Sequence, residues 1–213
     1  KRIKIIDNGI DLEDEQFRGG SVEARKKLGL TADEFVIGCV ARLTEEKAHR
    51  DLIHAFANFV HRGQKTRLVL VGDGPERESL QQLCFQLGIE DRVLFAGNRG
   101  DARSLYQAFD LFALVSVNEG LPMALLEAMA VCLPVVASRV GAIPRVIEDQ
   151  VSGILVIPSD IPAITDAFVK LEAEPEKAST MGEAARRKVK EHFSSGSMAQ
   201  KYLAAYKGAS EVA

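Results

Sequence analysis

The sequence predicts an α/β fold in which helices cover both faces of a parallel sheet. Short apolar runs typical of buried strands alternate with longer segments whose apolar residues recur at helical spacing. Gly and Pro mark the points at which one pattern gives way to the other. Strands that alternate with helices pair in parallel, because each crossover returns the chain to the same edge of the sheet. We therefore expect one doubly wound, Rossmann-like domain over residues 1–213, with a helical C-terminal tail.

The expected strands are short runs of β-branched and other apolar residues bounded by turn residues. They cover residues 1–6, 35–40, 68–71, 93–96, 111–115, 133–137 and 153–157. The expected helices cover residues 22–28, 52–60, 75–87, 101–109, 122–130, a short helix after a loop within 141–148, and 161–206 with breaks near 175 and 194–196. Asp101 begins one of them, and its carboxylate is expected to cap the free N–H groups of the first turn.

Composition excludes several classes of protein. The 213 residues are 46% hydrophobic and 27% charged, with a formal net charge of −3; this balance argues against nucleic acid as the main partner. No apolar run approaches the roughly 20 residues of a membrane span, and no signal peptide is visible. Cys39, Cys84 and Cys132 lie in apolar surroundings, which predicts buried thiols in a reducing compartment. We therefore expect a cytoplasmic protein, and the first residue, Lys1, indicates a piece of a longer one.

Two glutamates flank the start of one expected helix. Glu119 follows the strand at 111–115, and Glu127 lies in the helix that Pro122 opens, since proline suits a first turn. In an open α/β sheet, ligands bind at the carboxyl ends of the strands, and the free N–H groups around residues 121–124 favour an anion there. A buried carboxylate needs a partner, which sugar hydroxyls would supply. The pattern predicts a ligand with central phosphates and hydroxyls at both ends; the alternative is solvated surface charge.

Two cations follow the first core strand at the same edge of the sheet. Arg42 and Lys47 would neutralise a diphosphate, the arginine through its planar fork and the lysine as a point charge. The alternative is an exposed loop, because Glu45 and Glu46 lie between them.

A glycine-rich turn at residues 72–77 narrowly misses the dinucleotide fingerprint. Arg77 occupies the place of the third glycine, and no acidic residue closes a second strand about 20 residues later. A nicotinamide or flavin site is therefore disfavoured, although the turn would suit the wall of a nucleotide pocket. Binding of NADH would restore the redox alternative.

The remaining candidates give no metal site. His54 and His61 would share a helix face, but no third ligand is placed near them, so we expect none. The basic run at residues 186–190 reads as a solvated helix face, with peripheral contact to an anionic membrane surface as the alternative.

Together these residues resemble family 4 glycosyltransferases of the GT-B fold. The spacing from Glu119 to Glu127 matches the E-x7-E motif of that family, and the residues around it are close to the usual sequence of the motif. The other matching motifs fall in the family's order and cover residues 8–11, Arg42 with Lys47, 72–75, 108–110, 133–137, and Gly141 with Pro144. The resemblance extends from about Ile5 to Tyr206.

The resemblance implies the C-terminal, donor-binding domain of a two-domain enzyme, whose N-terminal domain holds the acceptor. It implies a retaining sugar transfer, of the hexosyltransferase type, from a UDP-, GDP- or ADP-sugar to a sugar or lipid-linked acceptor in polysaccharide or glycolipid synthesis. Neither a cofactor nor a metal is expected, and the isolated fragment is expected to be inactive. The reaction would take place in the cytoplasm or at the inner face of the membrane.

The same resemblance assigns roles to individual residues. The catalytic set is Glu119, which faces the donor sugar, with Arg42 and Lys47 on the diphosphate. Glu127 accepts hydrogen bonds from the ribose. The backbone around the helix start meets sugar and phosphate, and the loop after residue 96 frames the base. The residues implied in these backbone and loop contacts are Gly120, Leu121, Pro122, Met123, Ala124, Gly97 and Asn98.

Three positions depart from the family pattern. Cys132 and Ala142 stand where glycine is usual, and either would crowd a turn. Arg145 stands where glutamate is common, and a cation there would alter donor preference or mark a weakened enzyme. Arg145 is also the one support for a second hypothesis, a non-catalytic nucleotide-sugar sensor or scaffold of the same fold.

Overall fold

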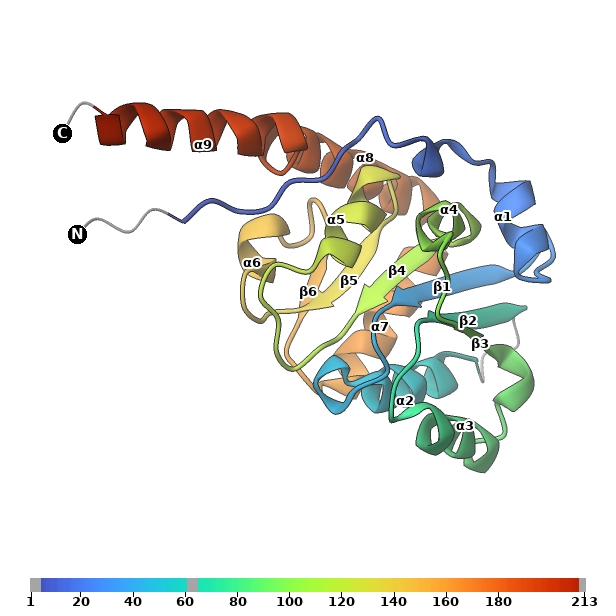
Figure 1. Ribbon diagram of the computed structural model, residues 1–213. Helices are drawn as coiled ribbons and strands as arrows, with labels where there is room; N and C mark the ends of the chain where they lie inside the picture. The colour runs from blue at the N-terminus through green and yellow to red at the C-terminus, as the bar shows by residue number, and fades with distance from the viewer. Residues whose placement is uncertain (1–4, 61–64, 211–213) are drawn as a thin grey trace.

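A single parallel sheet forms the centre of the computed structural model, which describes residues 5–60 and 65–210 (Figure 1). Its strands lie in the order β3-β2-β1-β4-β5-β6, and every pair of neighbours is parallel. The strands are β1 (Phe35–Val40), β2 (Thr66–Val71), β3 (Val93–Gly97), β4 (Leu111–Leu114), β5 (Val135–Ser138) and β6 (Ile154–Val156). This is the doubly wound, Rossmann-like sheet that the sequence predicts.

Helices cover both faces of the sheet. They are α1 (Ser21–Lys27), α2 (His49–Val60), α3 (Arg77–Gln86), α4 (Ala102–Leu105), α5 (Met123–Ala130), α6 (Ile143–Val146), α7 (Ile161–Ala173), α8 (Pro175–His192) and α9 (Ser195–Ser210). Four short 3-10 turns join them: η1 (Glu15–Arg18), η2 (Glu45–Lys47), η3 (Glu90–Arg92) and η4 (Tyr106–Ala108). Within the described part of the chain, no helix combines the length and the apolar character needed to cross a membrane.

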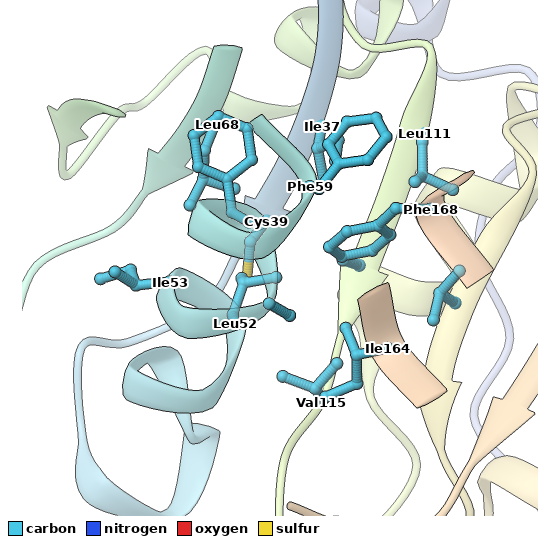
Figure 2. Close-up of a cluster of buried hydrophobic side chains, with 14 of the residues drawn as sticks. Ile37, Cys39, Leu52, Ile53, Phe59, Leu68, Leu111, Val115, Ile164 and Phe168 are labelled. Carbon is cyan, nitrogen blue, oxygen red and sulfur yellow. The ribbon is translucent and has the colours of Figure 1, made fainter. Parts of the chain in front are cut away.

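The two faces have separate apolar cores. Helices α2, α3 and α7 pack on one face, while α1, α4, α5 and α6 pack on the other, and α8 contributes to both. Figure 2 shows part of the first core, where Cys39 of β1 points toward Leu52 of α2 and Ile37 of the same strand lies beside Phe59. Phe59 and Phe168 meet edge to face with their ring centroids 5.9 Å apart, which joins α2 to α7. Because both faces are covered, the strands are apolar throughout, as parallel sheets require.

The winding direction reverses between β1 and β4. These strands are neighbours, but the chain leaves β1 for α2 on one face and leaves β4 for α5 on the other. They pair at Ile37–Leu111 and Gly38–Phe112, two residues short of the end of each strand. Such a reversal opens a crevice at the carboxyl edge of the sheet, which is the usual ligand position in this architecture.

Most of the strand expected at residues 1–6 falls on residues 1–4, which lie outside the described part. The described residues of this run, Ile5 and Ile6, have irregular structure, with Ile5 73% exposed. The chain instead makes one isolated bridge, between Ile10 and Ser194 at the start of α9.

Two further expectations are wrong in detail. Asp101 does not cap its helix, because its carboxylate accepts hydrogen bonds from the side chain of Arg99 at 2.8 and 3.0 Å. Where the sequence predicts a helix over residues 101–109, the structure has the four-residue helix α4, which continues as the turn η4. Cys39 and Cys84 are buried as expected, whereas Cys132 is only half-buried; all three are free thiols.

A close backbone contact docks α8 against the turn that follows α5. Cys132 adopts a left-handed conformation there, with φ of 62°, which is the position where the sequence resemblance expects glycine. A Cβ atom on Gly182 of α8 would lie 1.9 Å from the carbonyl oxygen of Cys132. Ala142, the second departure, has an ordinary φ of −85° and causes no strain.

We expect Gly182→Ala to lower the free energy of unfolding by about 1–3 kcal/mol, because α8 must move away from the turn to admit the methyl group. Gly196→Ala in α9 is the matched control, since nothing lies within 4 Å of its Cβ position and alanine favours a helix. Urea denaturation of both variants tests this, and equal effects would contradict the packing argument.

Candidate functional site

The loops at the carboxyl edge of the sheet are hydrogen-bonded to one another. The loop after β4 joins the loop after β1, because the Val117 N–H donates to the Glu46 carbonyl at 2.9 Å. The loop after β5 joins it from the other side, where the Ala142 N–H donates to the Gly120 carbonyl at 3.0 Å. Side chains on these loops are therefore carried by one connected backbone frame.

Gly141 makes the closest of these contacts possible. Its φ is +53°, and a Cβ atom there would lie 1.8 Å from the carbonyl oxygen of Glu119. Gly72 plays the same part on the other side of β1, where a Cβ would lie 2.0 Å from the Ala41 carbonyl oxygen. Both positions need glycine, because any side chain would push the loops apart.

An ion pair joins two loops at the sheet reversal. Lys47, at the end of η2, donates from Nζ to Glu119 Oε1 at 2.8 Å. Ser116 Oγ donates to the same oxygen at 2.7 Å. The Glu119 side chain is only 6% exposed and that of Lys47 is 19% exposed. The pair thus joins the loop after β1 to the loop after β4, which are 72 residues apart in sequence.

The residue after Lys47 holds an unusual backbone conformation. Ala48 has φ of 51° and ψ of 38°, in the left-handed region that a side chain disfavours, and it is buried. Its N–H donates to the Glu45 carbonyl at 3.0 Å and so closes the η2 turn. This turn fixes the direction in which Lys47 leaves the backbone.

A buried cysteine and histidine lie beneath this ion pair. Cys39 Sγ is 3.8 Å from His49 Nε2, and His49 Nδ1 has no hydrogen-bond partner among the described residues. Burial raises the pKa of Cys39 to about 12, with the charge of Lys47 acting in the opposite direction. Burial also lowers the pKa of His49 to about 4, and the nearby charge of Lys47 lowers it further. Both groups are therefore neutral at pH 7, so the two buried side chains beneath the ion pair carry no charge.

Arg42 lies outside the ion pair, in a neighbouring surface hollow. It is exposed and shares a hollow of about 360 Å³ with Gly72, Asp73, Asn98 and Arg99. Gly97 precedes this group with φ of 71°, and its carbonyl accepts the Gly72 N–H at 2.8 Å. The hollow therefore brings together one of the predicted cations and one of the predicted base-framing residues.

Two side chains hold Glu127, which lies in α5. Its Oε1 accepts from Arg103 Nε at 2.9 Å and its Oε2 accepts from the Tyr106 hydroxyl at 3.0 Å. Arg103 also donates to Asp14 at 2.6 Å. The predicted surface-charge alternative does not describe Glu127, whose side chain is 13% exposed and bonded through both oxygens.

The start of α5 lies in the sequence between the two carboxylates. Pro122 is the residue before the helix rather than its first residue, and in the part of the chain that the structure describes it provides no side-chain cap. The N–H groups of a first turn have no partner within the helix, so Met123 and Ala124 present donors at this end. Gly120 and Leu121 lead into it from Glu119 and complete the predicted backbone segment.

The structure thus brings some predicted residues together and leaves others apart. Lys47 and Glu119 touch, Arg42 and Asn98 share a hollow, and Glu127 has its own partners. Sequence reasoning missed Ser116, Arg103 and Tyr106. Ser116 carried a local signal, since it stands three residues before Glu119, whereas Arg103 and Tyr106 lie more than 20 residues from Glu127.

The other sequence candidates are placed as follows. Arg145, 56% exposed, pairs with Asp7 at 3.1 Å. His61 lies outside the described residues. Among the residues described, no group of three or more His, Cys, Asp or Glu side chains is arranged to hold a metal ion. Arg186, Arg187 and Lys190 line a separate surface hollow that Cys132 borders, at the opposite edge of the sheet.

Comparison with known proteins gives consistent matches. Residues 21–188 match the family model described as glycosyl transferases group 1. The chain is 35% identical over 206 residues to N-acetyl-alpha-D-glucosaminyl L-malate synthase of Bacillus anthracis, covering 97% of this chain and 54% of that protein. It is 37% identical over 196 residues to D-inositol 3-phosphate glycosyltransferase of Saccharomonospora viridis, covering 86% of this chain and 45% of that protein.

A solved structure of HepE from Anabaena in complex with UDP is also similar, with a TM-score of 0.87 and 28% identity, covering 96% of this chain and 57% of HepE. Another structure of HepE is in complex with UDP-glucose. The present chain spans about half the length of the curated relatives described above.

We expect Lys47→Met to lower the free energy of unfolding by about 1–3 kcal/mol, because it leaves Glu119 charged and poorly solvated. The double variant Lys47→Met with Glu119→Gln should recover part of this loss, since no buried charge remains. Denaturant titration of the two single variants and the double variant measures the coupling. Strictly additive effects would show that the two side chains do not interact.

We expect stability to fall as pH drops from about 6.5 to about 4, by up to about 3 kcal/mol from His49 alone. The pKa of His49 is lower in the folded state, so the unfolded state takes up its proton first and acid favours unfolding. Above pH 6.5 the contribution is fully present. His49→Leu should flatten this part of the profile, while the control His54→Gln should leave it, and an unchanged slope in His49→Leu would contradict the assignment.

Proposed function

Because this chain belongs to the glycosyl transferases group 1 family, we propose that it is the C-terminal, donor-binding half of a retaining glycosyltransferase. In this proposal the donor is a nucleotide-diphosphate sugar, bound at the carboxyl edge of the sheet. The motifs around Glu119 and Glu127 further suggest family 4 of the GT-B enzymes. The UDP complex of the similar protein HepE supports a nucleotide ligand and makes UDP the first nucleotide to test.

The observation that carries the proposal is the Lys47–Glu119 pair at the sheet reversal, 2.8 Å apart and largely shielded from water. A carboxylate in this place holds the lysine side chain at the crevice instead of letting it extend into solvent. Lys47 has three donor hydrogens, so it can bond a phosphate oxygen while it keeps Glu119. Glu119, whose Oε1 already has two donors, retains Oε2 for a sugar hydroxyl.

Catalysis would come from stabilising the leaving group. Negative charge grows on the diphosphate as the glycosidic bond breaks, and fixed donors act most strongly at that stage. Lys47, Arg42 and the N–H groups at the start of α5 are the groups that we assign to this task. A positive charge supplied by side chains removes the need for a metal ion in the proposed mechanism.

The acceptor would bind mainly outside this chain. We propose that a second, N-terminal domain supplies the acceptor site, because the chain spans about half the length of its relatives. The acceptor is then a sugar or a lipid-linked sugar, and the isolated chain should not turn over. Three free cysteines fit a reducing compartment, so we place the reaction in the cytoplasm.

We expect Arg42→Ala to weaken binding of a nucleoside diphosphate to the full-length protein by about 10- to 100-fold, as loss of a charge-assisted hydrogen bond would. Arg187→Ala is the matched control, because it removes the same charge at the opposite edge of the sheet. Isothermal titration calorimetry with UDP, GDP and ADP provides the measurement.

If the full-length wild-type protein bound none of these three nucleotides, the proposed function would be overturned. Binding without sugar transfer to a broad panel of acceptors would instead favour the non-catalytic sensor.

A further inference from the structure

We propose that Tyr106 and Arg103 are positioning residues that fix Glu127 as a two-site acceptor for the ribose of the donor. The proposal rests on the proposed function, since Glu127 is taken as the ribose-binding group. It adds two residues from a different element, α4 with η4, to the machinery of the site. Both residues would act through Glu127 and not by touching the donor.

Tyr106 is a rigid donor. Its side chain is fully buried, and its ring packs against Phe109 and Phe112 with centroid separations of 6.0 and 5.7 Å. Its hydroxyl lies 3.0 Å from Glu127 Oε2. Burial raises the pKa of Tyr106 well above its usual value, and the charge of Glu127 adds to this effect. The hydroxyl therefore keeps its proton and remains a donor to the carboxylate.

Arg103 holds the other oxygen. Its Nε donates to Glu127 Oε1 at 2.9 Å, while its NH1 donates to Asp14 at 2.6 Å. The guanidinium carbon also lies 5.9 Å from the centre of the Phe17 ring. The hydrogen bond to Glu127 is the largest cause that raises the pKa of Arg103. The arginine is thus fixed on two sides and cannot rotate freely around the carboxylate.

The number of free acceptor positions on Glu127 then matches the two hydroxyl groups of a ribose. An ionised carboxylate offers about four lone-pair positions, two on each oxygen. Tyr106 and Arg103 occupy one position on each oxygen of Glu127, which leaves one on each. A ribose carries two adjacent hydroxyl groups, and each needs one acceptor. A carboxylate held in one rotamer by two protein donors can accept both hydroxyls at once, whereas a mobile one would first have to be ordered.

A purely structural role is the competing explanation, because a carboxylate that is 13% exposed needs partners in any case. The two explanations differ in what they predict for the ligand. A structural role affects every ligand of the site equally. A positioning role affects only ligands that carry the ribose hydroxyls.

The test compares a nucleoside diphosphate with its 2′,3′-dideoxy analogue in the full-length protein, using whichever of UDP, GDP and ADP binds most tightly. Tyr106→Phe removes the hydroxyl and keeps the ring, and Arg103→Met removes the donors and keeps much of the stem. Tyr202→Phe, on the exposed side of α9, is the matched control. Thermal unfolding of each variant reports whether it is folded.

We expect Tyr106→Phe to weaken binding of the natural nucleotide by about 3- to 10-fold, the range for one hydrogen bond, with no change for the dideoxy analogue. Arg103→Met should behave in the same way. Because the Arg103 side chain is partly exposed, this variant should fold even if Tyr106→Phe does not, so the proposal can still be tested. Equal losses for both ligands, or no loss for either, would overturn the positioning role and leave the proposed function intact. A wild-type protein that binds no nucleoside diphosphate would overturn both.

Discussion

The contact between Lys47 and Glu119 joins the two halves of the sheet, β1 to β3 and β4 to β6. One residue follows β1 and the other follows β4, the neighbouring strands from which the chain turns toward opposite faces. Parallel winding alone would leave an open groove at that point, lined by backbone groups that need partners. The ion pair, with Ser116 as a second donor to Glu119, places a fixed charge pattern in the groove. The fixed charges of the candidate site therefore follow from topology first and from side-chain chemistry second.

Much of the fold could be predicted because its signals are local. The strand Phe35–Val40 is an apolar run with sharp boundaries, and the structure has it with the same bounds. The helix after Pro122 is marked by a proline and a run of strong helix formers. The predicted cap by Asp101 failed because Arg99 takes the carboxylate that the first turn of the helix was expected to use, and a capping pattern does not record such a competing partner.

The candidate site also combines residues with local sequence signals and residues without them. Glu119 and Glu127 stand out as candidates from their spacing, because both lie around one strand-to-helix junction. The neighbours that define their environment come from elsewhere: Lys47 is 72 residues from Glu119, and Asp14 is 89 residues from the arginine that it holds. Such pairs can be predicted only when the sheet order is known, because neither residue lies in a sequence pattern that identifies the other.

The left-handed backbone of Ala48 has a consequence for affinity. A glycine there would visit many conformations in solution and would have to be ordered whenever a ligand engaged the preceding lysine. Alanine in the same place is costly to fold into this shape but has fewer alternatives once it is buried. The entropy of arranging the turn is thus lost when the protein folds. For the ligand that we propose, this turn is preorganised, so tight recognition needs less compensation from new contacts.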